Sequence, residues 1–233
     1  MIKSSLKSNF FKFTESKKKK FKGSEYKYFN ENLNIIRFNF FKNQKINYNF
    51  SNNISGNEFI LLVTSGVVTF NLKKKKFRLK AYDAINFFPK SLNLEINTLK
   101  KGSAFLISAK PYKNFNNFRL KYFNFINNIK ARDLWGGQCI SRPYEAKFMT
   151  LVLFDLKKGF KFKDKGHFNE QITWLINGKM DFYVNNKIFS LYKNCGVDIR
   201  PNQVHGGTSM GALGFDVFFP KRNELGYKNK FIY

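Results

Sequence analysis

The chain of 233 residues is long enough for one or two domains, and its composition excludes a disordered protein: 43% of its residues are hydrophobic and 18% aromatic, including 30 phenylalanines. Its formal charge of +27 would suit nucleic acid or an anionic membrane surface. No helix-turn-helix, RNP or zinc-finger pattern accompanies the charge, and lysines outnumber arginines. We therefore interpret the charge as a solvated surface with weak affinity for polyanions.

Residues 1–27 are expected to form a basic tail. The start of the chain mixes lysine and serine with single aromatic residues and lacks the continuous apolar core of a secretory signal. No segment approaches the roughly 18 continuous apolar residues of a membrane span. Cys139 and Cys195 form no CxxC pair, so buried free thiols and a cytoplasmic protein are expected.

Residues 28–110 and 136–226 repeat one pattern at an offset of 112 positions. The segment Leu62–Phe70 matches Trp174–Phe182, with a glycine in the middle and a phenylalanine at the end of each. The same offset joins Phe77 to Phe189, Leu79 to Leu191 and Pro89 to Pro201. The sequence therefore predicts two copies of one domain, a connector at 111–135 and a short tail at 227–233.

Within each copy, short runs rich in valine, isoleucine, phenylalanine, tyrosine and threonine alternate with turn residues. Turns that recur about every 8–12 residues are typical of an antiparallel sandwich or a small barrel. An all-β fold is therefore expected in both copies.

The only two histidines, His167 and His205, both lie in the second copy. If residues 165–175 form one strand, then Lys165, His167 and Gln171 share one face of it, because side chains two apart point the same way. His205 follows a turn that contains Pro201. The second copy therefore contains the candidate site.

These spacings resemble the two motifs of the cupin superfamily. From Gly159, five residues lead to Lys165-Gly166-His167, three more to Gln171 and six more to Gly178, so that only the first motif histidine is absent. The second motif is matched from Gly196 to His205. The resemblance implies two tandem double-stranded β-helix (jelly-roll) barrels, with a divalent ion (Mn, Fe, Ni, Co or Zn) bound in the second by His167, Gln171 and His205.

Lys165 stands where the motif has a histidine, and a protonated amine cannot coordinate a metal. Two alternatives stay open. Either three protein ligands and water hold the ion, or the pocket is free of metal and the Lys165 ammonium stabilises a substrate carboxylate or enolate.

The segment Asp216–Arg222 is similar to the Asp-Val-Phe-x-Pro-x-Arg ending of cupins with a glutamine ligand that act on unsaturated uronates. The resemblance implies ring opening or isomerisation of such a uronate, with Asp216 moving a proton and Arg222 holding the carboxylate. A structural salt bridge between these two residues is the alternative. Trp174 is expected to pack in the core.

The first copy has no histidine and is interpreted as a scaffold. The leading hypothesis is an enzyme that acts on a small carboxylated sugar or similar metabolite in its C-terminal barrel. The alternatives are a non-catalytic small-molecule binding or regulatory protein that has lost its metal, and a polyanion-binding protein. A homodimer is left open.

Overall fold

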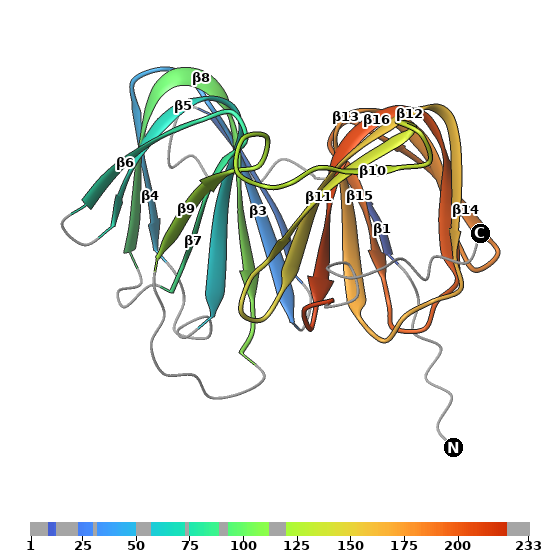
Figure 1. Ribbon diagram of the computed structural model, residues 1–233. Helices are drawn as coiled ribbons and strands as arrows, with labels where there is room; N and C mark the ends of the chain where they lie inside the picture. Colours follow the sequence, from blue (N-terminus) through green and yellow to red (C-terminus); the bar gives the residue numbers. More distant parts are fainter. Residues whose placement is uncertain are drawn as a thin grey trace. The chain divides into compact units, whose positions relative to one another are not determined.

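The computed structural model describes residues 9–12, 23–29, 32–49, 57–72, 75–88, 93–111 and 120–222. All sixteen regular elements in these residues are strands, and they form two eight-stranded antiparallel sheets. The chain divides into two compact units, one of residues 13–128 and one that joins residues 1–12 to residues 129–233 (Figure 1). The predicted all-β fold of two tandem barrels is confirmed.

The first unit contains strands β2 to β9. Its sheet runs in the order β2-β3-β8-β5-β7-β9, with β4 paired to β8 and β6 to β5. Alternate residues on the long strands are buried in one apolar core, which includes Phe38, Phe59 and Phe70. The strands are β2 (Gly23–Phe29), β3 (Leu33–Phe40), β4 (Gln44–Asn49), β5 (Glu58–Leu72), β6 (Lys75–Lys80), β7 (Asp83–Phe87), β8 (Asn93–Ala109) and β9 (Lys121–Asn124).

The second unit has the sheet order β1-β15-β13-β16-β12-β11-β10, with β14 paired to β13. Three strands of 15 residues, β12, β13 and β16, curve through this unit and form its wall (Figure 1). The strands are β1 (Asn9–Lys12), β10 (Arg132–Leu134), β11 (Cys139–Glu145), β12 (Thr150–Asp164), β13 (Glu170–Val184), β14 (Lys187–Tyr192), β15 (Cys195–Ile199) and β16 (His205–Phe219).

The offset of 112 positions holds for the strands themselves. The bounds of β5, β6 and β7, shifted by this offset, are the bounds of β13, β14 and β15, and β8 and β16 begin at equivalent residues. The repeated glycines explain part of this agreement. Gly66 and Gly178 both have φ = 82°, lie at irregularities of the strand pairing, and sit so close to neighbouring backbone that no side chain fits.

Strand β1 lies within the expected basic tail, β2 begins in it, and β9 and β10 lie within the expected connector. Strand β1 pairs with β15 from Asn9 opposite Asp198 to Lys12 opposite Cys195, and Phe10 stacks on Phe189 with ring centroids 5.7 Å apart. Strand β9 completes the first sheet, and β10 starts the second. Residues 1–8 and 13–22 of the expected tail, residues 112–119 of the expected connector, and the tail at 227–233 lie outside the described residues.

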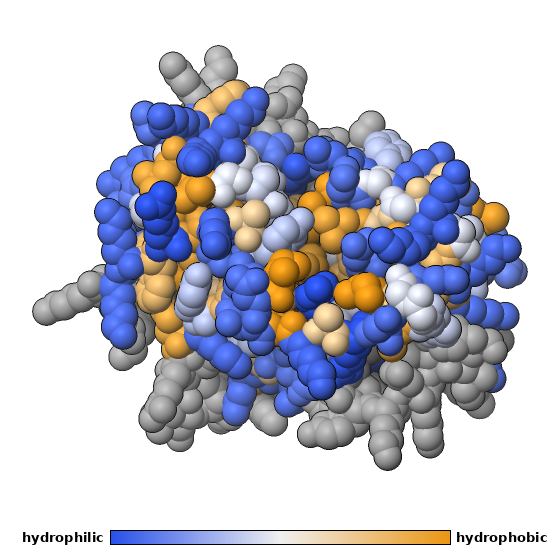
Figure 2. Space-filling model, turned by 45° about the horizontal axis from the view of Figure 1, so that its top comes forward, coloured by the Kyte–Doolittle hydropathy of each residue, from blue (hydrophilic) through white to orange (hydrophobic). Residues whose placement is uncertain are grey.

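On the face drawn in Figure 2, hydrophilic residues predominate, and apolar residues form separate patches between them. Both cysteines are buried and free, as predicted. Among the described residues there is no helix with the length and apolar character needed to cross a membrane.

Candidate functional site

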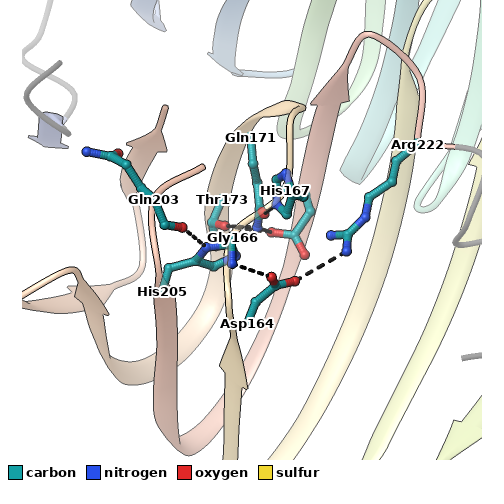
Figure 3. Close-up of polar contacts among 9 residues, drawn as sticks. Asp164, Gly166, His167, Gln171, Thr173, Gln203, His205 and Arg222 are labelled. Atoms are coloured by element: carbon teal, nitrogen blue, oxygen red, sulfur yellow. Dashed lines mark hydrogen bonds and ion pairs between the residues drawn. The ribbon is translucent and has the colours of Figure 1, made fainter. Parts of the chain in front are cut away.

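The C-terminal barrel encloses a cavity of about 120 Å³. Its walls come from β10 to β13 and β16, and from the residues that follow β16. The carboxylate, amide and imidazole side chains of the lining form one group with Thr173 and Arg222, and His167 lies beside this group (Figure 3). This group consists of Asp164, Gln171, Thr173, His205, Asp216 and Arg222.

His167 reaches the site from a loop rather than from a strand. The expected single strand over residues 165–175 is wrong, because β13 begins at Glu170. Gly166 interrupts it with φ = 99° and packs against the backbone of Asn202, whose N–H donates to the carbonyl oxygen of His167 at 2.7 Å. The loop nevertheless places His167 Nε2 3.0 Å from Gln171 Oε1.

His205 begins β16 and is fixed in one tautomer. Its Nδ1 lies 2.9 Å from the carbonyl oxygen of Gln203, which can only accept, so Nδ1 carries the proton and Nε2 keeps its lone pair. Burial lowers the pKa of His205 below its usual value, and the ring is therefore neutral near pH 7. A neutral imidazole held in this way is a good metal ligand.

The ring of His167 packs edge-on against that of His205, with centroids 5.2 Å apart. Burial, together with the positive charge of Arg222, lowers the pKa of His167 to about 4. Its Nδ1 is buried and has no hydrogen-bond partner among the described residues. The structure thus brings both predicted histidines together in their neutral forms.

Asp164, which the sequence analysis did not single out, occupies the place expected for Lys165. One carboxylate oxygen accepts from the Gly166 N–H at 2.9 Å, and the other lies 3.3 Å from Arg222 Nη2. Burial raises the pKa of Asp164, but His205, Arg222 and the Gly166 hydrogen bond outweigh burial and lower it overall. Lys165 is exposed and does not line the cavity, so this placement does not support a charge from Lys165 inside it.

Asp216 faces the cavity from β16. It accepts hydrogen bonds from Thr173 Oγ1 at 2.6 Å and from Gln171 Nε2 at 3.1 Å. Burial raises its pKa to about 6, although these two hydrogen bonds oppose the shift. Since the Gln171 amide nitrogen is used here, its amide oxygen is the atom that faces His167.

Arg222 forms a salt bridge with Asp164, whereas the alternative considered above pairs it with Asp216. Its guanidinium lies over the ring of Phe218 at 5.2 Å, and its backbone N–H donates to Thr150 Oγ1 at 2.9 Å. Trp174 is fully buried, as predicted. Of the site residues predicted from the sequence, Gln171, His205, Asp216 and Arg222 line the cavity, whereas Asp164 and Thr173 were not predicted.

The residues present fit a divalent metal. Carboxylate and imidazole atoms of Asp164, His167 and His205 all lie within 4.8 Å of one another. The distance of 3.0 Å between His167 Nε2 and Gln171 Oε1 is that of two ligands at right angles on an ion with bonds of about 2.1 Å. Two neutral imidazoles, an amide oxygen and a carboxylate suit Mn, Fe, Co, Ni or Zn.

No protein-family model and no curated protein matches the chain. Solved structures do match it. Protein Ylba from E. coli is 14% identical, with 91% of this chain and 90% of that chain covered and a TM-score of 0.72. AerE from Microcystis aeruginosa is 11% identical, with 90% and 98% covered and a TM-score of 0.73. Oxalate decarboxylase from Lactobacillus farciminis, in a formate complex, is 12% identical, with 91% and 86% covered and a TM-score of 0.69. At these identities the likeness concerns the fold, and it supports a cupin fold for this chain.

Proposed function

We propose that the C-terminal barrel is the active site of a metal-dependent enzyme that acts on a small carboxylated molecule. One observation carries the proposal: four metal-ligand side chains converge beside a guanidinium, and three of them line the cavity. These side chains are Asp164, His167, Gln171 and His205. Arg222, 3.3 Å from Asp164, supplies the positive charge.

The roles follow from the chemistry of each group. A bound divalent ion supplies a Lewis acid that polarises a substrate oxygen. The planar guanidinium of Arg222 suits a two-point contact with a carboxylate. Asp216, whose pKa is about 6, changes its protonation state near neutral pH and is suited to accept or donate a proton in the cavity.

The resemblance of Asp216–Arg222 to uronate-acting cupins implies one specific reaction, the ring opening or isomerisation of an unsaturated uronate. In support, both ends of this segment line the cavity. One structural neighbour is named an oxalate decarboxylase, and oxalate is also a small carboxylate. Carboxylates are therefore the substrate class to screen, with an unsaturated uronate and oxalate among the first compounds.

The N-terminal barrel is proposed as a scaffold. At the positions equivalent to Gln171 and His205 it has Phe59 and Asn93. Phe59 is buried in the apolar core and stacks on Phe87 with centroids 5.7 Å apart. An apolar ring thus fills the place where the second barrel has a metal ligand.

Elemental analysis of the purified, untagged chain tests the metal site. We expect near-stoichiometric Mn, Fe, Co, Ni or Zn in the wild type, and little metal in His205→Ala or His167→Ala. Lys165→Ala, a change on the exposed neighbour of Asp164, serves as the matched control and keeps its metal. Circular dichroism establishes that each variant is folded. Wild type that holds no metal and takes up none when it is added would overturn the proposal.

A non-catalytic small-molecule binding protein is the second candidate. The ion pair between Asp164 and Arg222 favours it, because the guanidinium partly neutralises the carboxylate and so competes with a metal ion for it. A metal-free wild type that still binds carboxylates would support this candidate over the enzyme.

A further inference from the structure

We propose that the ligand of this cavity carries a planar apolar body, such as a phenyl ring, attached to its carboxylate, and that Trp135 selects for that body. The inference deepens the proposed function, from which it takes the carboxylate end of the ligand. It concerns the remainder of the cavity, whose lining differs in character from the metal and arginine end.

Aromatic rings form a continuous series along the cavity. Ring centroids are 5.0 Å apart between Trp135 and Phe160, 6.2 Å between Phe160 and Phe162, 5.9 Å between Phe162 and Phe182, and 6.0 Å between Phe182 and His205. All of these residues line the cavity. The series therefore links the partly exposed Trp135 to a proposed metal ligand, and it offers ring faces and edges along the way.

Further lining residues extend the apolar surface. They are Leu134, Cys139, Pro143, Val152, Phe154, Leu156, Met180 and Phe218. Arg132, Ser141 and Lys163 are the other polar residues of the lining. A sugar acid carries hydroxyl groups on several sides of its ring, and those that face the apolar residues would lose their hydrogen bonds to water without replacement. A phenyl ring has no such groups, so the lining favours an aromatic carboxylate over a uronate.

The volume is also suitable. The cavity measures about 120 Å³. An engineered apolar cavity of roughly 150 Å³ is large enough to bind benzene. The cavity is somewhat smaller than that, so it suits no more than a single ring, and the carboxylate arm of the ligand has to reach the arginine end.

Trp135 is placed by an unusual turn between β10 and β11. Trp135, Gly136 and Gly137 have φ values of 62°, 62° and 81°, and the Gly137 N–H donates to Asp133 Oδ1. A bulky residue in the left-handed region is rare, and such residues gather where ligands are held. Trp135 is 38% exposed while lining the cavity, so its ring borders both ligand and solvent.

Isothermal titration of the full chain with three probes tests the inference: 3-phenylpropionate, propionate and galacturonate. Each is titrated into metal-free protein and into protein supplied with Mn²⁺. We expect 3-phenylpropionate to bind roughly 10- to 100-fold more tightly than propionate, because the ring is transferred from water to an apolar wall. Galacturonate is expected to bind no more tightly than propionate.

Trp135→Asn removes the ring while keeping a residue that tolerates left-handed backbone. It is expected to weaken 3-phenylpropionate by roughly 2- to 12-fold and to leave propionate unchanged. Tyr192→Asn is the matched control, because Tyr192 is 39% exposed and does not line the cavity. The control should bind both probes as the wild type does.

The outcomes separate the two proposals. Galacturonate binding as tightly as 3-phenylpropionate, or Trp135→Asn weakening both monocarboxylates equally, overturns the inference and leaves the metal enzyme standing. Failure to take up Mn²⁺ overturns the enzyme, while ring selectivity is still measured on metal-free protein. If none of the three probes binds in either form, the inference is wrong.

Discussion

Gly178 provides the most direct test of how the repeat shapes the active barrel. At φ = 82° an alanine is strained, and its Cβ would also lie much closer than 3.0 Å to the carbonyl oxygen of Gly211. Gly159 has nearly the same φ, 86°, but no atom within 4 Å of an added Cβ. The pair Gly178→Ala and Gly159→Ala therefore separates the backbone strain from the steric clash.

The expected magnitudes follow from these two terms. The left-handed conformation costs an alanine about 1–2 kcal/mol, which is the whole effect at Gly159. Overpacking adds about 1–3 kcal/mol at Gly178, because backbone rather than a flexible side chain must move. At about 2–4 °C per kcal/mol, Tm falls by roughly 2–8 °C for Gly159→Ala and by roughly 4–20 °C for Gly178→Ala.

Tryptophan fluorescence is a suitable assay, because both tryptophans of the chain, Trp135 and Trp174, lie in the C-terminal unit. Thermal unfolding followed by tryptophan emission therefore reports this unit, while circular dichroism reports both. Gly66→Ala, the equivalent change in the other unit, should shift the circular dichroism transition more than the fluorescence transition. Equal losses of Tm in Gly159→Ala and Gly178→Ala would refute the steric argument.

Three further predictions concern the thiol, the first strand and the proton-transferring carboxyl. Both cysteines are buried, and burial raises the pKa of Cys139 to about 12. At pH 8 the native chain should therefore resist iodoacetamide, whereas the chain unfolded in guanidinium reacts at both cysteines. Mass spectrometry counts the adducts. Deleting residues 2–12 uncovers the edge of β15 and removes the stacking of Phe10 on Phe189. The deletion should lower the stability of the C-terminal unit by about 2–4 kcal/mol, measured by urea unfolding followed by tryptophan fluorescence. Unchanged stability would argue against the pairing of β1 with β15. Thr173→Val removes a hydrogen bond that favours the charged form of Asp216, so the pKa of Asp216 rises above about 6. The acidic limb of the pH–rate profile then moves to higher pH. A profile that does not move would exclude Asp216 as the base.

The sequence predicted those features that depend on local pattern. The 112-residue offset predicted equivalent strands, because the same glycines are required where the long strands bend, as at Gly66 and Gly178. The spacing of His167, Gln171 and His205 predicted their convergence, although the loop at Gly166 replaced the expected strand. The bend of the strand at Gly178 and the loop at Gly166 therefore bring these side chains together even though residues 165–169 are not part of a strand.

Features that depend on distant contacts were not predictable in the same way. Strand β1 is short and rich in lysine and phenylalanine, and it is stabilised by pairing with β15, some 185 positions away in the chain. Asp164 was missed because the motif directed attention to Lys165, and only the folded chain shows which of two adjacent side chains faces the cavity. The aromatic series from Trp135 to His205 likewise joins residues of β12, β13, β16 and a turn.

The proximity of Asp164 to Arg222 leads to one more prediction, which concerns coupling between metal and carboxylate. A metal ion bound to the Asp164 carboxylate neutralises part of the carboxylate's charge and weakens the attraction between Asp164 and the Arg222 guanidinium, 3.3 Å away. Arg222 then becomes more available to a carboxylate ligand. Linkage then requires that Mn²⁺ tighten carboxylate binding and that the carboxylate tighten Mn²⁺ binding by the same factor, expected to be at least about fivefold. Titrations in both orders measure the two factors. In Asp164→Asn the neutral amide no longer mediates the exchange, so the coupling should fall towards one while Arg222 still binds the carboxylate. Equal coupling in wild type and Asp164→Asn would show that Asp164 does not connect the two ligands.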